Sequence, residues 1–298
     1  MGIAIQTSAA LPKQVERQDQ GALRQFYRHI RREPLNLAFF FVLVGIVLVA
    51  IFADAIVPYD PVAQSLLSLN QQPSAAHWLG TDQFGRDVLS RIIYGARTSL
   101  ILGLSAPILA AISGTAFGLY AGYVGGWQDR LIGRVVDLLL SFPALLLGIL
   151  VAAALSPGFW SMVAVLTIAF APRFARIARA STLSLRTAPF VEAAVAAGLT
   201  HPVIIVRHIL PNIIGPIVVV LTLWIATAIR LEATLSFLGL GTQPPQPSWG
   251  NIIRDGLNNM FGSAWPIIAA GVAITITVLA LNMIGDAVRD ILDPDSRS

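Results

Sequence analysis

The sequence predicts an all-α membrane protein with six transmembrane helices. Of its 298 residues, 55% are hydrophobic and 12% are charged, and the mean hydropathy is +0.72, whereas soluble domains carry about 25% charged residues. The apolar residues also gather in blocks, and a span needs roughly 20 such residues to cross about 30 Å of hydrocarbon. The six predicted spans are Leu37–Val57, Ser99–Val124, Leu138–Leu155, Phe159–Ala171, Ile213–Ile229 and Trp265–Ile284.

The distribution of arginine predicts that both termini are cytoplasmic. Cytoplasmic loops of membrane proteins carry the excess of positive charge. Arginines gather before the first span, between the second and third, between the fourth and fifth, and after the sixth. The intervening loops, residues 58–98 and 231–264, are poorer in arginine. We therefore expect these two loops to be external and the loop of residues 172–212 to be cytoplasmic.

Residues 1–36 are predicted to form a cytoplasmic tail, and residues 37–298 the transmembrane domain. Within the tail, Gly21–Pro34 has apolar residues at helical spacing with arginines between them, which is typical of a basic amphipathic helix on the inner leaflet of a membrane. This helix could be a charge anchor for the first span or a specific docking element. The first apolar block is of full length and is not followed by a convincing cleavage site, so we expect it to be retained.

The second span carries small residues at every fourth position: Ala106, Ala110, Gly114, Gly118 and Gly122. One face of this helix therefore has almost no side chain, and such a face lets another helix approach closely in lipid. The approaching helix could belong to this chain. It could also belong to a second, related subunit, which would make Gly114, Gly118 and Gly122 subunit-packing residues.

Prolines and charges mark the ends of the other spans. Pro143 should kink the third span or start a helix. Pro172 and Arg173 are expected to end the fourth span. Asp137 lies just before an apolar run and could pair with Arg134 or Arg130. In the first external loop a helix is expected before the second span, with four charged side chains that could pair in water: Asp82, Arg86, Asp87 and Arg91.

Glu232, at the end of the fifth span, is the most conspicuous charge of the second external loop. It could pair with Arg230, cap local backbone, or act as a periplasmic gate of a transport pathway. The following Leu235–Gly241, LSFLGLG, is apolar but too short to span. It could dip into the outer leaflet or cover the mouth of a pathway.

Several kinds of chemistry have no support in the sequence. The only lysine is Lys13, in the tail, and its surroundings do not match the phosphate-binding G-x-x-x-x-G-K-[ST] loop, so the chain is not a P-loop ATPase by itself. It has no cysteine, no H-E-x-x-H and no G-x-S-x-G. We therefore expect no catalytic residues and no metal site. Because the arginines follow the membrane pattern, we expect no nucleic-acid partner.

The cytoplasmic loop contains VEAAVAAGLTHPVIIVRHILPN, Val191–Asn212, which is too polar to span and too patterned for a slack loop. Glu192 near the amino end and the alanines that follow favour a short helix, and Gly198 allows a sharp stop. A plain helical hairpin would explain these helices but not why the first is thin, exposed and tipped with a carboxylate. A thin helix fits close approach to another protein.

This segment resembles the EAA loop of binding-protein-dependent ABC importer permeases. The matching residues are Glu192, Ala193, Ala194, Gly198, Leu210 and Pro211. His208 is a departure, because the family usually has an aliphatic residue there. Three further segments resemble the C-type permeases of the dipeptide, oligopeptide and nickel transport group: GTDQFGRDVLSR (Gly80–Arg91), LSFLGLGTQPPQPSWG (Leu235–Gly250) and GDAVRDILDP (Gly285–Pro294).

The resemblance implies a type I ABC importer permease fold in the bacterial inner membrane. It implies that the EAA segment is a coupling helix that inserts into a groove of a cytoplasmic ATPase. The implied partners are a related B-type permease, one or two P-loop ATPase subunits and a periplasmic or lipid-anchored solute-binding protein. ATP and Mg would be bound by the ATPases, with no cofactor on this chain. The implied substrate is a peptide, with nickel chelates and opines left open.

Two other classes remain as alternatives. A self-sufficient channel or secondary carrier would need ion-binding groups inside the membrane, and the sequence shows almost none. The nucleotide dependence of transport distinguishes it from an importer subunit. A membrane-bound enzyme is the third alternative, and a turnover assay on the isolated protein would test it.

Overall fold

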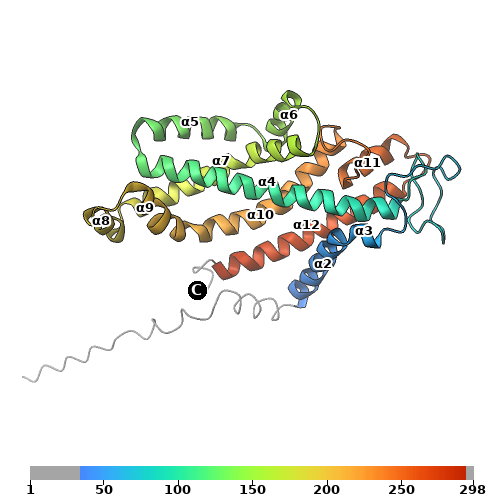
Figure 1. Ribbon diagram of the computed structural model, residues 1–298, viewed down its shortest axis with the longest axis horizontal. Helices are drawn as coiled ribbons and strands as arrows, with labels where there is room; N and C mark the ends of the chain where they lie inside the picture. The colour runs from blue at the N-terminus through green and yellow to red at the C-terminus, as the bar shows by residue number, and fades with distance from the viewer. Residues whose placement is uncertain (1–33, 293–298) are drawn as a thin grey trace, which may run out of the picture.

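The computed structural model describes residues 34–292 as a bundle of long helices (Figure 1). The helices are α2 (Pro34–Ile51), α3 (Ala53–Ile56), α4 (Val88–Val124), α5 (Gly126–Ser141), α6 (Ala144–Ala154), α7 (Phe159–Arg186), α8 (Pro189–Ala196), α9 (His201–Ile204), the π-helix η1 (Ile205–Ile209), α10 (Leu210–Phe237), α11 (Trp249–Asn258) and α12 (Trp265–Leu292). The predicted tail helix, apart from Pro34, lies outside the described residues and stays a prediction.

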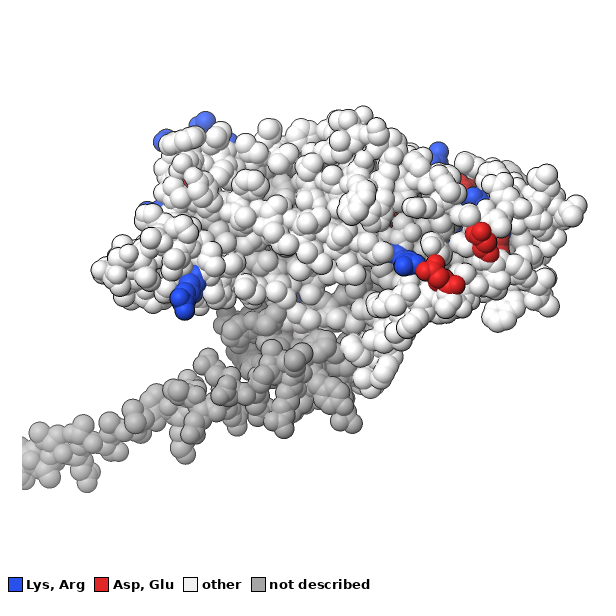
Figure 2. Space-filling view, viewed as in Figure 1, with Lys and Arg blue, Asp and Glu red and all other residues white. Residues whose placement is uncertain are grey.

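The all-helical membrane fold is confirmed. Within residues 34–292, five helices are long and apolar enough to cross a membrane, and α5 and α6 together could form a sixth span. Figure 2 agrees, because the charged side chains on the face shown gather at the two ends of the molecule, with an uncharged band between them. A band of this kind is what a bilayer requires of the surface that it surrounds.

The bundle is held by helices that pack along their length. α4 lies against α7, and α10 lies against α4, α7 and α12. The main core is centred on α4 and α7 and contains the fully buried Met162, Phe170 and Phe174. A second core lies around Trp249 of α11, where α2, α4, α10 and α12 meet. The two ends of the bundle are therefore stabilised by different sets of side chains.

The third predicted span, Leu138–Leu155, is wrong as a single helix. α5 ends at Ser141, α6 begins at Ala144, and the two helices are bent by 101°. Pro143 lies directly before α6. At the start of a helix the backbone N–H has no partner within the helix, so proline is tolerated there. The prediction that Pro143 kinks the span or starts a helix is confirmed.

Three helices are longer than predicted. α7 continues past Ala171 through Pro172 to Arg186. Pro172 removes one backbone hydrogen bond, which packing against neighbouring helices can offset inside a membrane bundle. α4 begins at Val88 because Asp87 caps it, accepting a hydrogen bond from the backbone N–H of Ser90 at 2.8 Å. α10 continues to Phe237, so LSFLGLG begins as helix and does not form a separate dipping segment.

The two ends of the bundle carry different structures (Figure 1). α8, α9 and η1 lie at one end, beside the C-terminal ends of α4 and α7. The loop of residues 58–87 lies at the opposite end, together with α3 and α11. The EAA-like segment and the first long loop are thus separated by the length of the long helices.

Candidate functional site

The EAA-like segment forms a short helix that projects from the end of the bundle. α8 begins at Pro189, and Glu192 lies in its first turn, where a negative charge is favourable. Glu192 and Ala193 are exposed, whereas Val191 and Ala194 face the core. The helix is therefore fixed to the bundle by one side and presents the other to solvent.

Gly198 ends this helix in the way that the sequence predicts. Its φ is +78°, in the left-handed region that favours glycine. The N–H of Gly198 donates to the carbonyl of Val195 at 2.9 Å, and the N–H of Leu199 donates to the carbonyl of Ala194 at 3.2 Å. This pair of bonds is the Schellman motif. A side chain at Gly198 would meet nothing within 4 Å, so the constraint there is conformational.

Apolar side chains surround Glu192 on the exposed side of this end. Their exposed fractions range from 40% to 51%: Phe190 (42%), Val195 (51%) and Leu199 (40%). We call Phe190, Glu192, Ala193, Val195 and Leu199 the α8 surface. It combines exposed apolar side chains with one carboxylate, so it is a candidate surface for binding another protein.

Leu210 and Pro211 lie at the start of α10, directly after the π-helix Ile205–Ile209. Pro211 has no N–H, so it cannot donate to the carbonyl four residues earlier, and an irregular helix at this point is consistent with that loss. Leu210 is half-buried and Pro211 is exposed. His208, the departure from the EAA pattern, has a buried Nδ1 that makes no hydrogen bond within residues 34–292.

An open cavity of about 880 Å³ lies beside this segment. Its lining is mainly apolar and comes from the end of α4, from Arg186, and from α8 to α10. The lining residues are Ala116, Leu119, Tyr120, Tyr123, Val124, Arg186, Val191, Val195, His201, Pro202, Ile205, Val206 and Leu210. The Tyr123 hydroxyl and His201 Nδ1 lie 2.9 Å apart at its wall.

The small-residue face of α4 is filled by α7 of the same chain. A Cβ on Gly114 would lie 2.3 Å from the carbonyl oxygen of Ala171, and one on Gly118 would lie 2.3 Å from that of Ala175. Gly122 likewise lies against Thr182. The assignment of these three glycines to a subunit interface is therefore wrong, and the alternative of packing inside this chain is confirmed.

Glu232 is buried within α10 and does not protrude from the bundle. Its side chain is 0% exposed. The hydroxyl groups of Ser99 and Ser236 donate to its carboxyl oxygens at 3.2 and 2.7 Å. The Ser99 hydroxyl also accepts from the backbone N–H of Trp249 at 3.3 Å. Glu232 therefore joins α4, α10 and α11, and no pairing with Arg230 is present.

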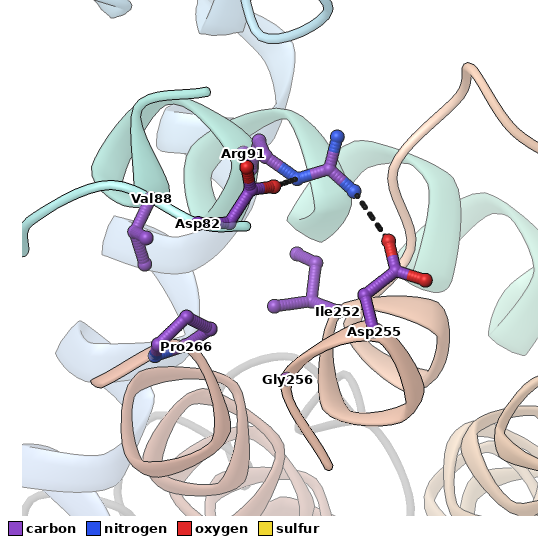
Figure 3. A pocket seen from close by; sticks show the side chains of 7 residues that line it. All are labelled: Asp82, Val88, Arg91, Ile252, Asp255, Gly256 and Pro266. Carbon is purple, nitrogen blue, oxygen red and sulfur yellow. Dashed lines mark ion pairs between the residues drawn. The ribbon is translucent and has the colours of Figure 1, made fainter. Parts of the chain in front are cut away.

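The charged residues in and after the loop of residues 58–87 form a buried cluster and do not pair in water. Arg86 lies 2.6 Å from Asp82 and 3.0 Å from Asp255, and Arg91 lies 3.5 Å from each of these two carboxylates. The arginine side chains are 4% and 3% exposed. Figure 3 shows Arg91 between the two aspartates, beside a small cavity that Pro266 also lines. Asp87 pairs with His77 instead. The cluster fastens the loop of residues 58–87 to α11. Asp255 was not predicted to take part, because it is far from the loop in the sequence.

α7 carries three arginines at intervals of three residues, Arg173, Arg176 and Arg179. Arg176 pairs with Asp137 of α5 at 2.6 Å, so the expected pairing of Asp137 with Arg134 or Arg130 is wrong. Arg179 binds Asp129 of α5 through both Nε and Nη2. Arg173 lies over the ring of Trp224 of α10, with its Cζ 4.5 Å from the ring centroid.

Comparison with known families identifies the chain by two segments. Residues 114–298 match the family described as the binding-protein-dependent transport system inner membrane component. Residues 21–73 match the N-terminal TM domain of oligopeptide transport permease C. Together the matched segments include the first span, the C-terminal part of α4 and all the helices that follow it. Within residues 34–292, no group of three His, Asp or Glu side chains could hold a metal ion.

Similar proteins cover nearly the whole chain. The dipeptide transport system permease protein DppC of Alkalihalophilus pseudofirmus is 41% identical over 275 residues, 92% of this chain and 90% of that protein. The glutathione transport system permease protein GsiD of Pectobacterium atrosepticum is 39% identical over 293 residues, 97% of each chain. A solved structure of the MetNI methionine ABC transporter in an inward-facing conformation has a similar fold. Its TM-score is 0.55 at 20% identity, over 67% of this chain and 96% of that one.

The family match, the relatives and the helical fold agree. The chain is a multi-pass permease of the inner membrane, without catalytic function of its own, and it belongs to the family of binding-protein-dependent transport system inner membrane components.

Proposed function

We propose that this permease forms half of the translocation pathway of an ATP-driven importer and is driven through the α8 surface. The observation that carries the proposal is the exposed Glu192 among apolar side chains on a helix held at the end of the bundle. The chain does not match the P-loop pattern, so ATP must be hydrolysed by partner subunits. One or two P-loop ATPases would bind ATP and Mg and contact Glu192, Ala193 and Gly198. Ala194 is buried and would hold α8 against the bundle, while Leu210 and Pro211 would link the segment to α10.

The arginine pattern supports an orientation with α8 and both termini in the cytoplasm. Residues 58–87 and α11 would then face the periplasm, where a solute-binding protein, free or lipid-anchored, would deliver the substrate. A related B-type permease would form the other half of the pathway. Because α7 fills the glycine face of α4, the contact with that permease is expected on other surfaces.

A peptide is the substrate that the similar proteins favour. The names of the relatives include a dipeptide and a glutathione permease, and glutathione is itself a modified tripeptide. Nickel chelates and opines are the other candidate solutes. A ligand screen of the solute-binding protein would distinguish them, because that protein would select the solute.

Glu232 is proposed to act at the periplasmic gate by keeping the helices around it in fixed relative positions. Its hydrogen bonds join α4 and α10, and Ser99 links it to the backbone at the start of α11. A side chain at this junction would fix the relative positions of the outer ends of these helices.

The test is uptake by proteoliposomes that contain the complete importer. We expect uptake of a labelled peptide to require the binding protein. We also expect it to require ATP and Mg on the side of the vesicle membrane where the ATPase subunits lie. Uptake that is driven by an ion gradient without nucleotide would support the channel or carrier alternative and contradict the proposal.

A further inference from the structure

α7 carries arginines at intervals of three residues, and only two of them have an acidic partner among residues 34–292. Asp137 and Asp129 of α5 neutralise Arg176 and Arg179. Arg173, one turn further into the helix, makes no ion pair with any described carboxylate. Its Nη1 donates to the carbonyl of Ala169 at 3.1 Å, and a guanidinium has five N–H donors. Most of its donors are therefore free to bind a ligand.

Arg173 lies in the middle of its helix. It is 14 residues from Phe159 and 13 from Arg186, about 20 Å from each end at 1.5 Å per residue. Trp224, which it contacts, is 14 residues from Leu210 and 13 from Phe237 in α10. Trp224 also lies within the predicted fifth span, Ile213–Ile229. A charge beside it would be costly in lipid, and such charges usually face the interior of the bundle or a hydrated pathway.

The contact with Trp224 fixes the guanidinium without neutralising it. The Cζ lies 4.5 Å from the ring centroid, and Trp224 in turn packs on the buried Phe170 with ring centroids 5.0 Å apart. A guanidinium held over an aromatic face keeps the N–H groups at its edge available for bidentate binding of a carboxylate. The structure therefore holds a positive group ready to accept an anion.

We propose that Arg173 binds the C-terminal carboxylate of the peptide as it passes through the bundle. This inference rests on the proposed function. Every linear peptide ends in a carboxylate whatever its side chains, so a single arginine suits a pathway that must accept many sequences. Arginine is also the side chain whose geometry matches a carboxylate with two parallel hydrogen bonds.

A lipid phosphate is the competing ligand, and the geometry favours it less. The guanidinium is directed at Trp224 of α10, a side chain of the bundle.

The experiment compares Arg173→Gln and Arg173→Lys with the native importer in proteoliposomes. The probes are one labelled peptide with a free C-terminus and the same peptide as its C-terminal amide, each at a concentration that saturates the binding protein. Peptide uptake and ATP hydrolysis are measured together. Arg176→Gln is the matched control, because its ion pair is exposed and such pairs contribute little.

We expect Arg173→Gln to lower uptake of the free acid by about tenfold or more, because it removes both hydrogen bonds to the carboxylate. ATP hydrolysis should stay near the native rate, so that fewer peptides cross per ATP. Uptake of the amide should change little, and Arg173→Lys should recover part of the loss. Arg176→Gln should resemble the native protein.

Unchanged uptake per ATP in Arg173→Gln would overturn the inference. An equal loss of acid and amide would also overturn it, and a loss that follows the anionic lipid content of the vesicles would assign Arg173 to lipid. A native importer that moves no peptide with ATP would contradict the proposed function instead, so the two failures are distinguishable.

Discussion

At the scale of single residues, Glu192 is the side chain on which coupling should depend. It is exposed and makes no hydrogen bond to other side chains within residues 34–292, so its removal should not alter the fold. We predict that Glu192→Ala lowers ATP-dependent uptake by about tenfold or more, because a hydrogen bond to a charged group contributes about 1.5–3 kcal/mol. Membrane insertion and thermal unfolding, followed by fluorescence, should match the native protein. Native uptake in this variant would remove Glu192 from the coupling surface.

Gly198 should matter through its backbone conformation. At φ +78° a β-branched side chain is strongly disfavoured, although space is free there. We predict that Gly198→Val displaces the end of α8 and lowers recovery of the ATPase with the permease. Gly215→Val is the matched control, because that glycine also has nothing within 4 Å but lies within α10 without a positive φ. Equal effects of the two variants would contradict the argument.

The stability of the permease should depend on the size and hydrogen bonds of the side chain at position 232 more than on its charge. Glu232→Gln keeps an acceptor for the serine hydroxyls, so we predict a thermal unfolding temperature close to the native one. Glu232→Ala leaves a cavity and unpartnered hydroxyls and should destabilise by about 2–5 kcal/mol. Differential scanning measurements on the purified permease check both. Equal destabilisation by the two substitutions would show that the hydrogen bonds do not hold this junction.

At the scale of helices, the packing of α4 on α7 sets the bundle. A Cβ at Gly118 would lie 2.3 Å from a backbone oxygen, so Gly118→Ala should destabilise by about 1–3 kcal/mol. Gly133→Ala in α5, with nothing within 4 Å, should be neutral or stabilising. Thermal unfolding of the permease without its partners is the decisive measurement. If Gly118→Ala affected only the assembled importer, and not the isolated permease, this face of α4 would have to contact another subunit.

The sequence predicts helices well where apolar runs are uninterrupted, and less well where proline intervenes. Pro143 and Pro172 carry the same local signal, yet the chain bends by 101° at the first and continues as helix through the second. The difference is tertiary, because α7 is packed against α4 around Pro172, whereas α5 has no buried residue. No local pattern contains that information.

The site residues divide in the same way. Gly198 and Pro189 were predictable because their roles are local, in ending and starting a helix. The environment of Glu232 was not, since its partner Ser99 is 133 positions away in the sequence. Asp255 and Trp224 were missed for the same reason. The three-residue spacing of Arg173, Arg176 and Arg179 indicates one face of a helix. Only the structure shows which of these arginines have acidic partners.

At the scale of the whole molecule, the two ends have different tasks. In the proposed importer, the end with α8 would offer its small exposed surface to an ATPase subunit that supplies energy from another chain. The other end holds its long loop rigidly, through a buried cluster of two arginines and two aspartates. Breaking one partner of a buried pair costs about 3–5 kcal/mol, so this end is suited to a fixed platform and the α8 end to transmission of movement.

The most direct test of the central claim is cross-linking from α8. The chain has no cysteine, so Ala193→Cys and Ala75→Cys each place a single thiol at an exposed position, one on the α8 surface and one in the loop of residues 58–87. Each is labelled with a thiol-reactive photo-cross-linker in the assembled importer. We predict that the probe at residue 193 captures an ATPase subunit and the probe at residue 75 does not. Capture of the ATPase from residue 75, or from neither position in an importer that hydrolyses ATP, would contradict the account.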